Sequence, residues 1–215
     1  MVATAASRRR HILDQAERLF AEHGYHDAAL AEIARAAGLG NAGLIHHFPS
    51  KPALYRAVLE RLAEEIDGRL AAAIASARGV EARLRAFVRI LADWSYERPL
   101  AVRLIPRELL DNSERVATAR VPPLSAFVVS GKEIIADAQA AGLVTPCPAE
   151  VVLTLIIGSS SYAAVVRPTF RQILRTRLLK SERRWLDAIA DKLLVLLLGL
   201  VEAPARKSWR RKRQR

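Results

Sequence analysis

The chain has 215 residues, 51% of them hydrophobic, with ten glycines, ten prolines and a single cysteine. This apolar content excludes a disordered chain, and the lone cysteine excludes an intramolecular disulfide and a cysteine-rich zinc site. A net charge of +12 favours a polyanionic partner, with nucleic acid ahead of an acidic membrane surface.

The excess positive charge lies at the two ends of the sequence. Residues 206–215 hold seven cations and no acid, and Arg8, Arg9 and Arg10 add three more near the other end. Between them, residues 11–205 carry 24 cations against 22 acids. We therefore expect a nearly neutral folded body, a basic arm at residues 1–10 and a disordered basic tail at 206–215.

The first four predicted helices follow one another closely. Apolar residues recur at helical spacing from Ile12 to Phe20, and Gly24 is expected to end that helix. Short helices at 30–37 and 41–47 come next. Ser50 and Pro52 are typical of a helix start, and apolar residues then recur every four positions as far as Ile74. These patterns predict three short to medium helices followed by one long helix.

Further helices are expected in the second part of the chain, where glycines and prolines mark the breaks. No stretch alternates with the period of two that a strand needs, so the predicted class is all-α. We expect a domain at 1–55, a helical domain at 56–205 and the tail at 206–215. The later helices are predicted at 80–96, 99–110, 115–141, 149–167 and 182–201.

The two most apolar stretches, 151–166 and 193–201, do not predict a membrane span. Gly158 and three serines interrupt the first, and the second is shorter than the ~20 residues that cross a bilayer. The sequence also offers no apolar leader segment, because Arg8–Arg10 come too early. We expect a cytoplasmic protein without a membrane partner.

Two short helices joined by a tight glycine turn form a helix-turn-helix pattern, here 29–37, 38–40 and 41–47. In this arrangement the second short helix enters the major groove of DNA, and the first supports it across the backbone. The pattern predicts a DNA-binding domain built on the helix at 12–20.

At these residues the sequence resembles the TetR family of transcriptional regulators. The resemblance implies a homodimer with an N-terminal DNA-binding domain and a C-terminal domain for a small-molecule effector and for dimerisation. We expect the dimer contact in the last two long helices, at about 149–167 and 182–201. The segments that carry the resemblance are Ile12–Ala16, Leu19–Tyr25, Ile33–Gly38 and Leu44–Lys51.

The chain departs from the family pattern where phosphate contacts are expected. Uncharged residues, most of them small or apolar, replace the hydroxyl and lysine side chains that family members often carry, and residues 40–47 contain no Lys or Arg. Fewer phosphate contacts mean less sequence-independent affinity. The replaced positions are Ala28, Ala29, Gly40, Asn41, Gly43 and Ile45.

DNA contacts are expected from the remaining polar and basic side chains. Asn41 can pair with adenine and a histidine with guanine or phosphate, while the basic arm offsets the missing hydroxyls as a flexible extension. The candidate DNA-binding residues are Arg8, Arg9, Arg10, Gly40, Asn41, Ala42, Gly43, His46, His47 and Lys51.

Other site types fit the sequence less well. Residues 38–43 match the G-x-G-x-x-G nucleotide pattern, but a predicted helix precedes them where a strand is required. His46 and His47 point about 100° apart on a helix and do not chelate one metal well. No histidine follows His47 to activate the serines at 159–161, so neither an enzyme nor a metal or other cofactor is expected.

An effector pocket would draw on aromatic and basic residues of the second domain. Each aromatic fits a plain core position at least as well, and the arginines fit surface pairs with Glu108 or Asp111. The candidates are Trp94, Tyr96, Arg103, Arg107, Phe127 and Tyr162.

The sequence thus predicts a TetR-like regulator, a repressor that a small-molecule effector releases from a double-stranded DNA operator. The alternative is a degenerate relative that binds DNA weakly or nonspecifically and acts mainly as a ligand- or polyanion-binding dimer.

Overall fold

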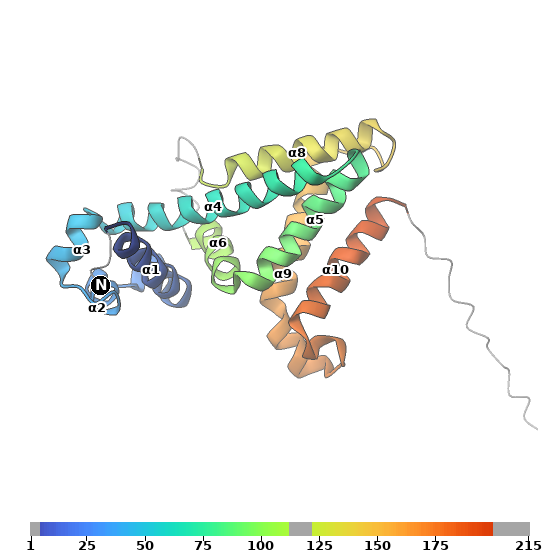
Figure 1. Ribbon diagram of the computed structural model, residues 1–215. Coiled ribbons are helices and arrows are strands. Elements are labelled where there is room, and N and C mark those ends of the chain that lie inside the picture. The colour runs from blue at the N-terminus through green and yellow to red at the C-terminus, as the bar shows by residue number, and fades with distance from the viewer. Residues whose placement is uncertain (1–4, 112–121, 200–215) are drawn as a thin grey trace, which may run out of the picture.

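A computed structural model describes residues 5–111 and 122–199, and this part of the chain is helical without a strand (Figure 1). The predicted all-α class is confirmed. The helices are α1 (Ala5–Asp27), α2 (Leu30–Ala36), α3 (Asn41–His47), α4 (Lys51–Ser76), α5 (Val80–Glu97), α6 (Pro99–Asp111), α8 (Ser125–Ala140), α9 (Ala149–Leu174) and α10 (Glu182–Leu197), with a 3₁₀ turn at Leu178–Lys180.

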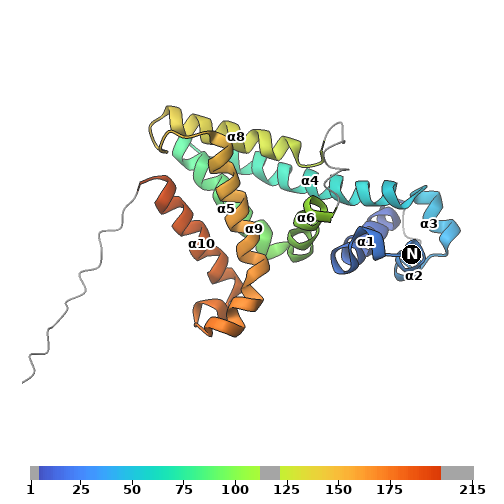
Figure 2. The same ribbon diagram turned by 180° about the vertical axis from the view of Figure 1, so that it is seen from behind.

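The long helix α4 connects the two parts of the molecule. Helix α1 packs on its first half, α2 and α3 lie at the same end, and α8 runs beside its second half in both views (Figures 1 and 2). Ser50 accepts a hydrogen bond from the Ala53 amide, the N-cap that its position predicts. Because α4 continues without interruption past residue 55, the predicted division at 55/56 falls inside a helix.

The N-terminal part is built on the apolar face of α1. Ile12, Ala16 and Phe20 are fully buried there, as the spacing predicted. Gly24 adopts a left-handed conformation with φ of 83°, which bends the chain near the end of α1. The helix begins earlier than its apolar pattern, at Ala5.

Helix α5 forms the centre of the C-terminal part and contacts α4, α8, α9 and α10. Phe87 of α5 packs against Phe127 of α8, with ring centroids 5.3 Å apart. Gly131 allows this close approach, because a Cβ atom there would lie 2.6 Å from Cζ of Phe87. The core of this part thus depends on one small residue in α8.

Two helix boundaries differ from the sequence prediction. The helix expected at 115–141 begins only at Ser125, because Pro122 and Pro123 precede it; residues 115–121 lie outside the described part. Helix α9 continues through Pro168 to Leu174, although proline was expected to end it. The proline removes one backbone donor, yet the flanking turns remain helical.

Helix α9 is long and apolar enough to cross a bilayer by length and composition alone. A core helix of a globular protein passes the same test, and α9 packs one face on α5, α8 and α10. One face of residues 151–166 is therefore buried in the core, whereas much of the opposite face is exposed.

Candidate DNA-binding surface

The turn between α2 and α3 has a defined backbone geometry. Gly38 has φ of 69°, its amide donates to the Arg35 carbonyl, and the Leu39 amide donates to the Ala34 carbonyl. This pair of hydrogen bonds is the Schellman arrangement that ends a helix at a left-handed glycine. The turn fixes the angle at which α3 leaves α2.

One side of helix α3 packs on the core, and the other side is exposed. Leu44 is completely buried and anchors the helix on the core. Asn41, Ala42 and His46 lie on the exposed side, with Ile45 43% exposed beside them. A short helix that presents an outer face in this way matches the element that reads the major groove in helix-turn-helix proteins.

The other candidate residues of this helix are less accessible. Gly43 and His47 are half-buried, and Gly43 lies against the Leu39 side chain. The His47 ring stands 5.6 Å from the ring of His46, between centroids, so the two histidines are neighbours with different exposure. His46 is therefore the better placed of the two for contact with a base.

Neither short helix has a side-chain cap at its N-terminus. Ala29 is the N-cap of α2 and Gly40 the N-cap of α3, and neither has an oxygen that could accept an amide hydrogen. Ala28 is fully buried, so a hydroxyl there would not reach the surface. The missing hydroxyls that the sequence indicated therefore leave two uncapped helix ends beside the candidate surface.

The basic residues near α3 lie on helices. Arg8, Arg9 and Arg10 are exposed on the first turns of α1, so the expected flexible extension is wrong for these three residues. The Arg9 guanidinium lies 4.9 Å from the ring centroid of Phe48, directly after α3. Lys51 donates to the His26 carbonyl at 2.8 Å, and desolvation lowers its pKa.

A chain of ion pairs joins α1 to the C-terminal part. Glu17 is 4% exposed and binds Arg61 of α4 at 2.5 Å and Arg98, directly after α5, at 2.9 Å. Arg98 also binds Glu65 of α4 at 3.1 Å. The sequence did not predict this cluster, although the position of Glu17 on the apolar face of α1 was a signal that it needed a buried partner.

Helix α6 makes a second connection to the N-terminal part. The Tyr55 hydroxyl donates to Glu108 at 2.8 Å in a buried contact. Arg107 donates to the Glu22 carbonyl at 3.3 Å and packs over Gly24, where a Cβ atom would lie 3.2 Å from its Nε. Arg107 thus links α6 directly to the bend near the end of α1.

The predicted effector-pocket residues do not come together. Trp94 and Phe127 are buried in the core, whereas Tyr162 is 63% exposed on the outer side of α9. Tyr96 lies under the Arg183 guanidinium at 5.8 Å. The two arginines are on α6, where Arg103 is exposed and Arg107 reaches α1.

Known transcriptional regulators are similar to this chain in sequence. Residues 12–58 match the family model described as bacterial regulatory proteins, tetR family. The HTH-type transcriptional regulator RutR of Escherichia coli (strain K12) is 27% identical over 165 residues, which cover 76% of each chain. The HTH-type transcriptional repressor Rv1474c of Mycobacterium tuberculosis (strain ATCC 25618 / H37Rv) is 44% identical over 75 residues, 35% of this chain and 37% of that protein.

Solved structures of other proteins have a similar fold over most of the length of this chain. A putative transcriptional regulator, SCO4942 from Streptomyces coelicolor, has a TM-score of 0.68 and 26% identity, covering 89% of this chain and 98% of that one. AibR, solved with isovaleryl coenzyme A and operator DNA, has a TM-score of 0.67 and 22% identity over 89% of this chain and 98% of its own. The helix-turn-helix, the family model that matches residues 12–58 and these relatives together support a TetR-like transcriptional regulator.

Proposed function

We propose that the protein is a homodimeric repressor that binds operator DNA through α3 and leaves it when a small molecule binds the C-terminal helices. The exposed face of α3, held over a buried Leu44, carries the proposal. The roles follow the predicted domains, 1–55 for DNA and 56–205 for effector and dimer. As a DNA-binding regulator, the protein would act in the cytoplasm.

Base contacts and phosphate contacts come from different helices in this proposal. Asn41 and His46, both exposed on α3, face the base edges, where amide and imidazole groups can hydrogen-bond. Arg8, Arg10 and Lys51 lie on neighbouring helix starts and face phosphates. Phosphate contacts set register and general affinity, so α1 would supply what α3 lacks.

Effector control requires a link between the two domains, and two groups of contacts can provide it. The ion pairs of Glu17 with Arg61 and Arg98 connect α1 with α4 and the end of α5. The hydrogen bond from Tyr55 to Glu108 connects α4 with α6. An effector that favours another arrangement of α5 and α6 changes the position of α1 through these contacts. The size of this change is limited by the difference between the effector's affinities for the two arrangements.

The proposed dimer interface is the outer face of α9, packed beside α10. Four large side chains at helical spacing are about half exposed there, which is more apolar surface than one helix of a monomer needs to expose. Small residues at Gly158 and Ser159 permit close helix approach. The four are Val151, Leu155, Tyr162 and Val165, which are 49%, 56%, 63% and 52% exposed.

Footprinting on the promoter of its own gene tests the DNA-binding half of the proposal. Specific protection of a two-fold symmetric site, absent for His46→Ala, supports the repressor. Uniform, salt-sensitive coating without a defined site contradicts it and favours the weak polyanion binder instead.

Salt titration tests the role of α1. Replacing Arg8 and Arg10 by glutamine is expected to lower affinity and to reduce the slope of log K against log salt by about 0.9 for each phosphate that is no longer neutralised. Arg78→Gln is the control, because Arg78 is exposed just beyond the far end of α4. Equal slopes for both variants and the wild type would contradict the phosphate contacts.

A further inference from the structure

A hollow of about 470 Å³ lies between α4 and α8, outside the DNA-binding part. Its walls are formed mainly by Leu70, Ala71 and Ile74 of α4 and Ala126 of α8. The volume lies within the range of about 300–1,000 Å³ that small-molecule sites occupy. None of the residues that the sequence suggested for an effector lines it.

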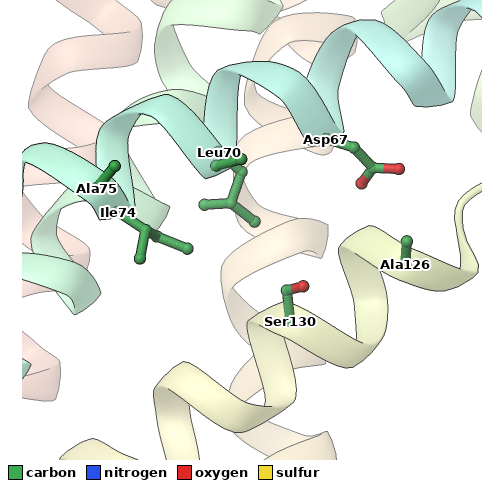
Figure 3. Close-up of a pocket in the computed structure, with 7 residues that line it drawn as sticks. Asp67, Leu70, Ile74, Ala75, Ala126 and Ser130 are labelled. Carbon is green, nitrogen blue, oxygen red and sulfur yellow. The ribbon is translucent and has the colours of Figure 1, made fainter.

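Two polar side chains converge at one end of this hollow. Figure 3 shows Asp67 of α4 and Ser130 of α8 directed toward the same gap, near Ala126. Neither side chain has a hydrogen bond or an ion pair among residues 5–111 and 122–199. Ligand sites typically combine an apolar wall with a few convergent polar groups of this kind.

The carboxylate of Asp67 differs from the neighbouring acid on the same helix. Glu65, two residues earlier, binds Arg69 and Arg98 at 3.0 and 3.1 Å. Asp67 instead points into the hollow, and desolvation raises its pKa. A partly desolvated carboxylate without a cation is complementary to a positively charged ligand group.

We infer that this hollow binds a small aliphatic amine, whose ammonium group pairs with Asp67 and donates to the Ser130 hydroxyl while its alkyl chain lies along Leu70 and Ile74. A metal ion is disfavoured, since one carboxylate and one hydroxyl are too few protein ligands. The alanines at 71, 75 and 126 leave room for a slim chain. Its role as the effector site rests on the proposed function.

The length of the hollow suggests a suitable probe. Asp67 and Ala75 are eight residues apart on α4, or about 12 Å along the helix axis, close to the length of an extended eight-carbon chain. Octylammonium is therefore the probe, with octanoate as its counterpart of opposite charge. Both are titrated into the full chain by isothermal calorimetry at pH 7, below their micellar concentrations.

Octylammonium is expected to bind once per chain, whereas octanoate is not. Asp67→Asn should weaken the binding about tenfold or more, because it removes a charge-assisted hydrogen bond while keeping the shape of the side chain. Glu64→Gln is the matched control: Glu64 is an exposed acid three residues earlier on α4, and its replacement should leave binding unchanged. Ala71→Phe should block the hollow, with folding checked by circular dichroism.

Equal binding of octylammonium by wild type and Asp67→Asn, or equal binding of octanoate, would overturn the inference. Operator footprinting in the presence of octylammonium is read separately. Asp67-dependent binding with an unchanged footprint supports the amine site but contradicts its role as effector site. Absence of binding overturns the amine site, whatever the footprint shows for the repressor.

Discussion

Glu17 shows how a single side chain can join the two parts of this protein. Two arginines share this acid, one from the middle of α4 and one directly after α5. A buried charge is tolerated only with such partners, so the position of α1 is tied to the presence of both. Glu17 thus stabilises the contact between the two parts and, under the proposed function, also transmits the effect of a bound effector to α1.

Glu17→Gln is expected to lower the free energy of unfolding by about 2–3 kcal/mol. This is less than the cost of breaking a fully buried pair, because Arg61 and Arg98 are partly exposed and retain Asp14 and Glu65. Urea unfolding followed by circular dichroism measures the change. Asp14→Asn removes an exposed partner of the same Arg61 and should cost under about 0.5 kcal/mol; similar costs for both would contradict a special role for Glu17.

Asp67 leads to a prediction about pH. Desolvation raises its pKa in the folded protein, so the folded state holds its proton more tightly than the unfolded state. The contribution of Asp67 to stability is therefore fully present below the ordinary aspartate pKa and is lost as pH rises through the raised value. Asp67→Asn should raise the unfolding temperature at pH 7 and leave it nearly unchanged near pH 3, as calorimetry can measure. An unchanged unfolding temperature at pH 7 would contradict this assignment.

At the level of elements, the uncapped start of α2 is a clear local weakness. Ala29 has the extended backbone of an N-cap, and Glu32 stands three residues later. A serine at 29 would complete the S-x-x-E capping box, in which each side chain accepts a hydrogen bond from the backbone of the other residue. Sequence and structure agree here because capping depends on local residue order.

Ala29→Ser is expected to stabilise the protein by about 1 kcal/mol and to strengthen operator binding by adding a hydroxyl beside the candidate surface. Thermal unfolding and gel-shift titration measure the two effects. Ala28→Ser, which buries a hydroxyl at a fully buried position, should destabilise instead. A gain from both substitutions would argue against capping as the cause.

Some features of the helices and their contacts could not be predicted from the sequence. Periodicity and glycine turns predicted α1 to α4 well, because both signals are local. Proline was expected to end α9 at residue 168, but the helix continues to Leu174 although most residues of this last stretch are exposed, so burial does not account for it. The ion pairs of Glu17 join residues 44 and 81 positions apart, and the hollow at Asp67 exists only because α8 lies beside α4.

At the scale of the whole molecule, dimerisation is the main prediction. In a two-fold interface every residue of the patch faces the same patch on the partner, so one new charge appears twice. Leu155→Asp combined with Tyr162→Asp should give a monomer with weak operator binding, as measured by light scattering and gel shift. Val129→Asp, at an exposed apolar residue of α8, is the control and should remain dimeric. A dimer in the double variant would place the interface elsewhere.

The unbroken course of α4 has a mechanical consequence. Its 26 residues span about 38 Å, with the N-cap beside α3 at one end and the hollow around Asp67 toward the other. A helix of that length turns a small rotation into a large displacement. A tilt of about 5° at the distal end displaces the proximal end by about 3 Å, close to one base-pair step. Under the proposed function, a ligand that separates α4 from α8 only slightly would put the two recognition helices of a dimer out of phase with the grooves of DNA.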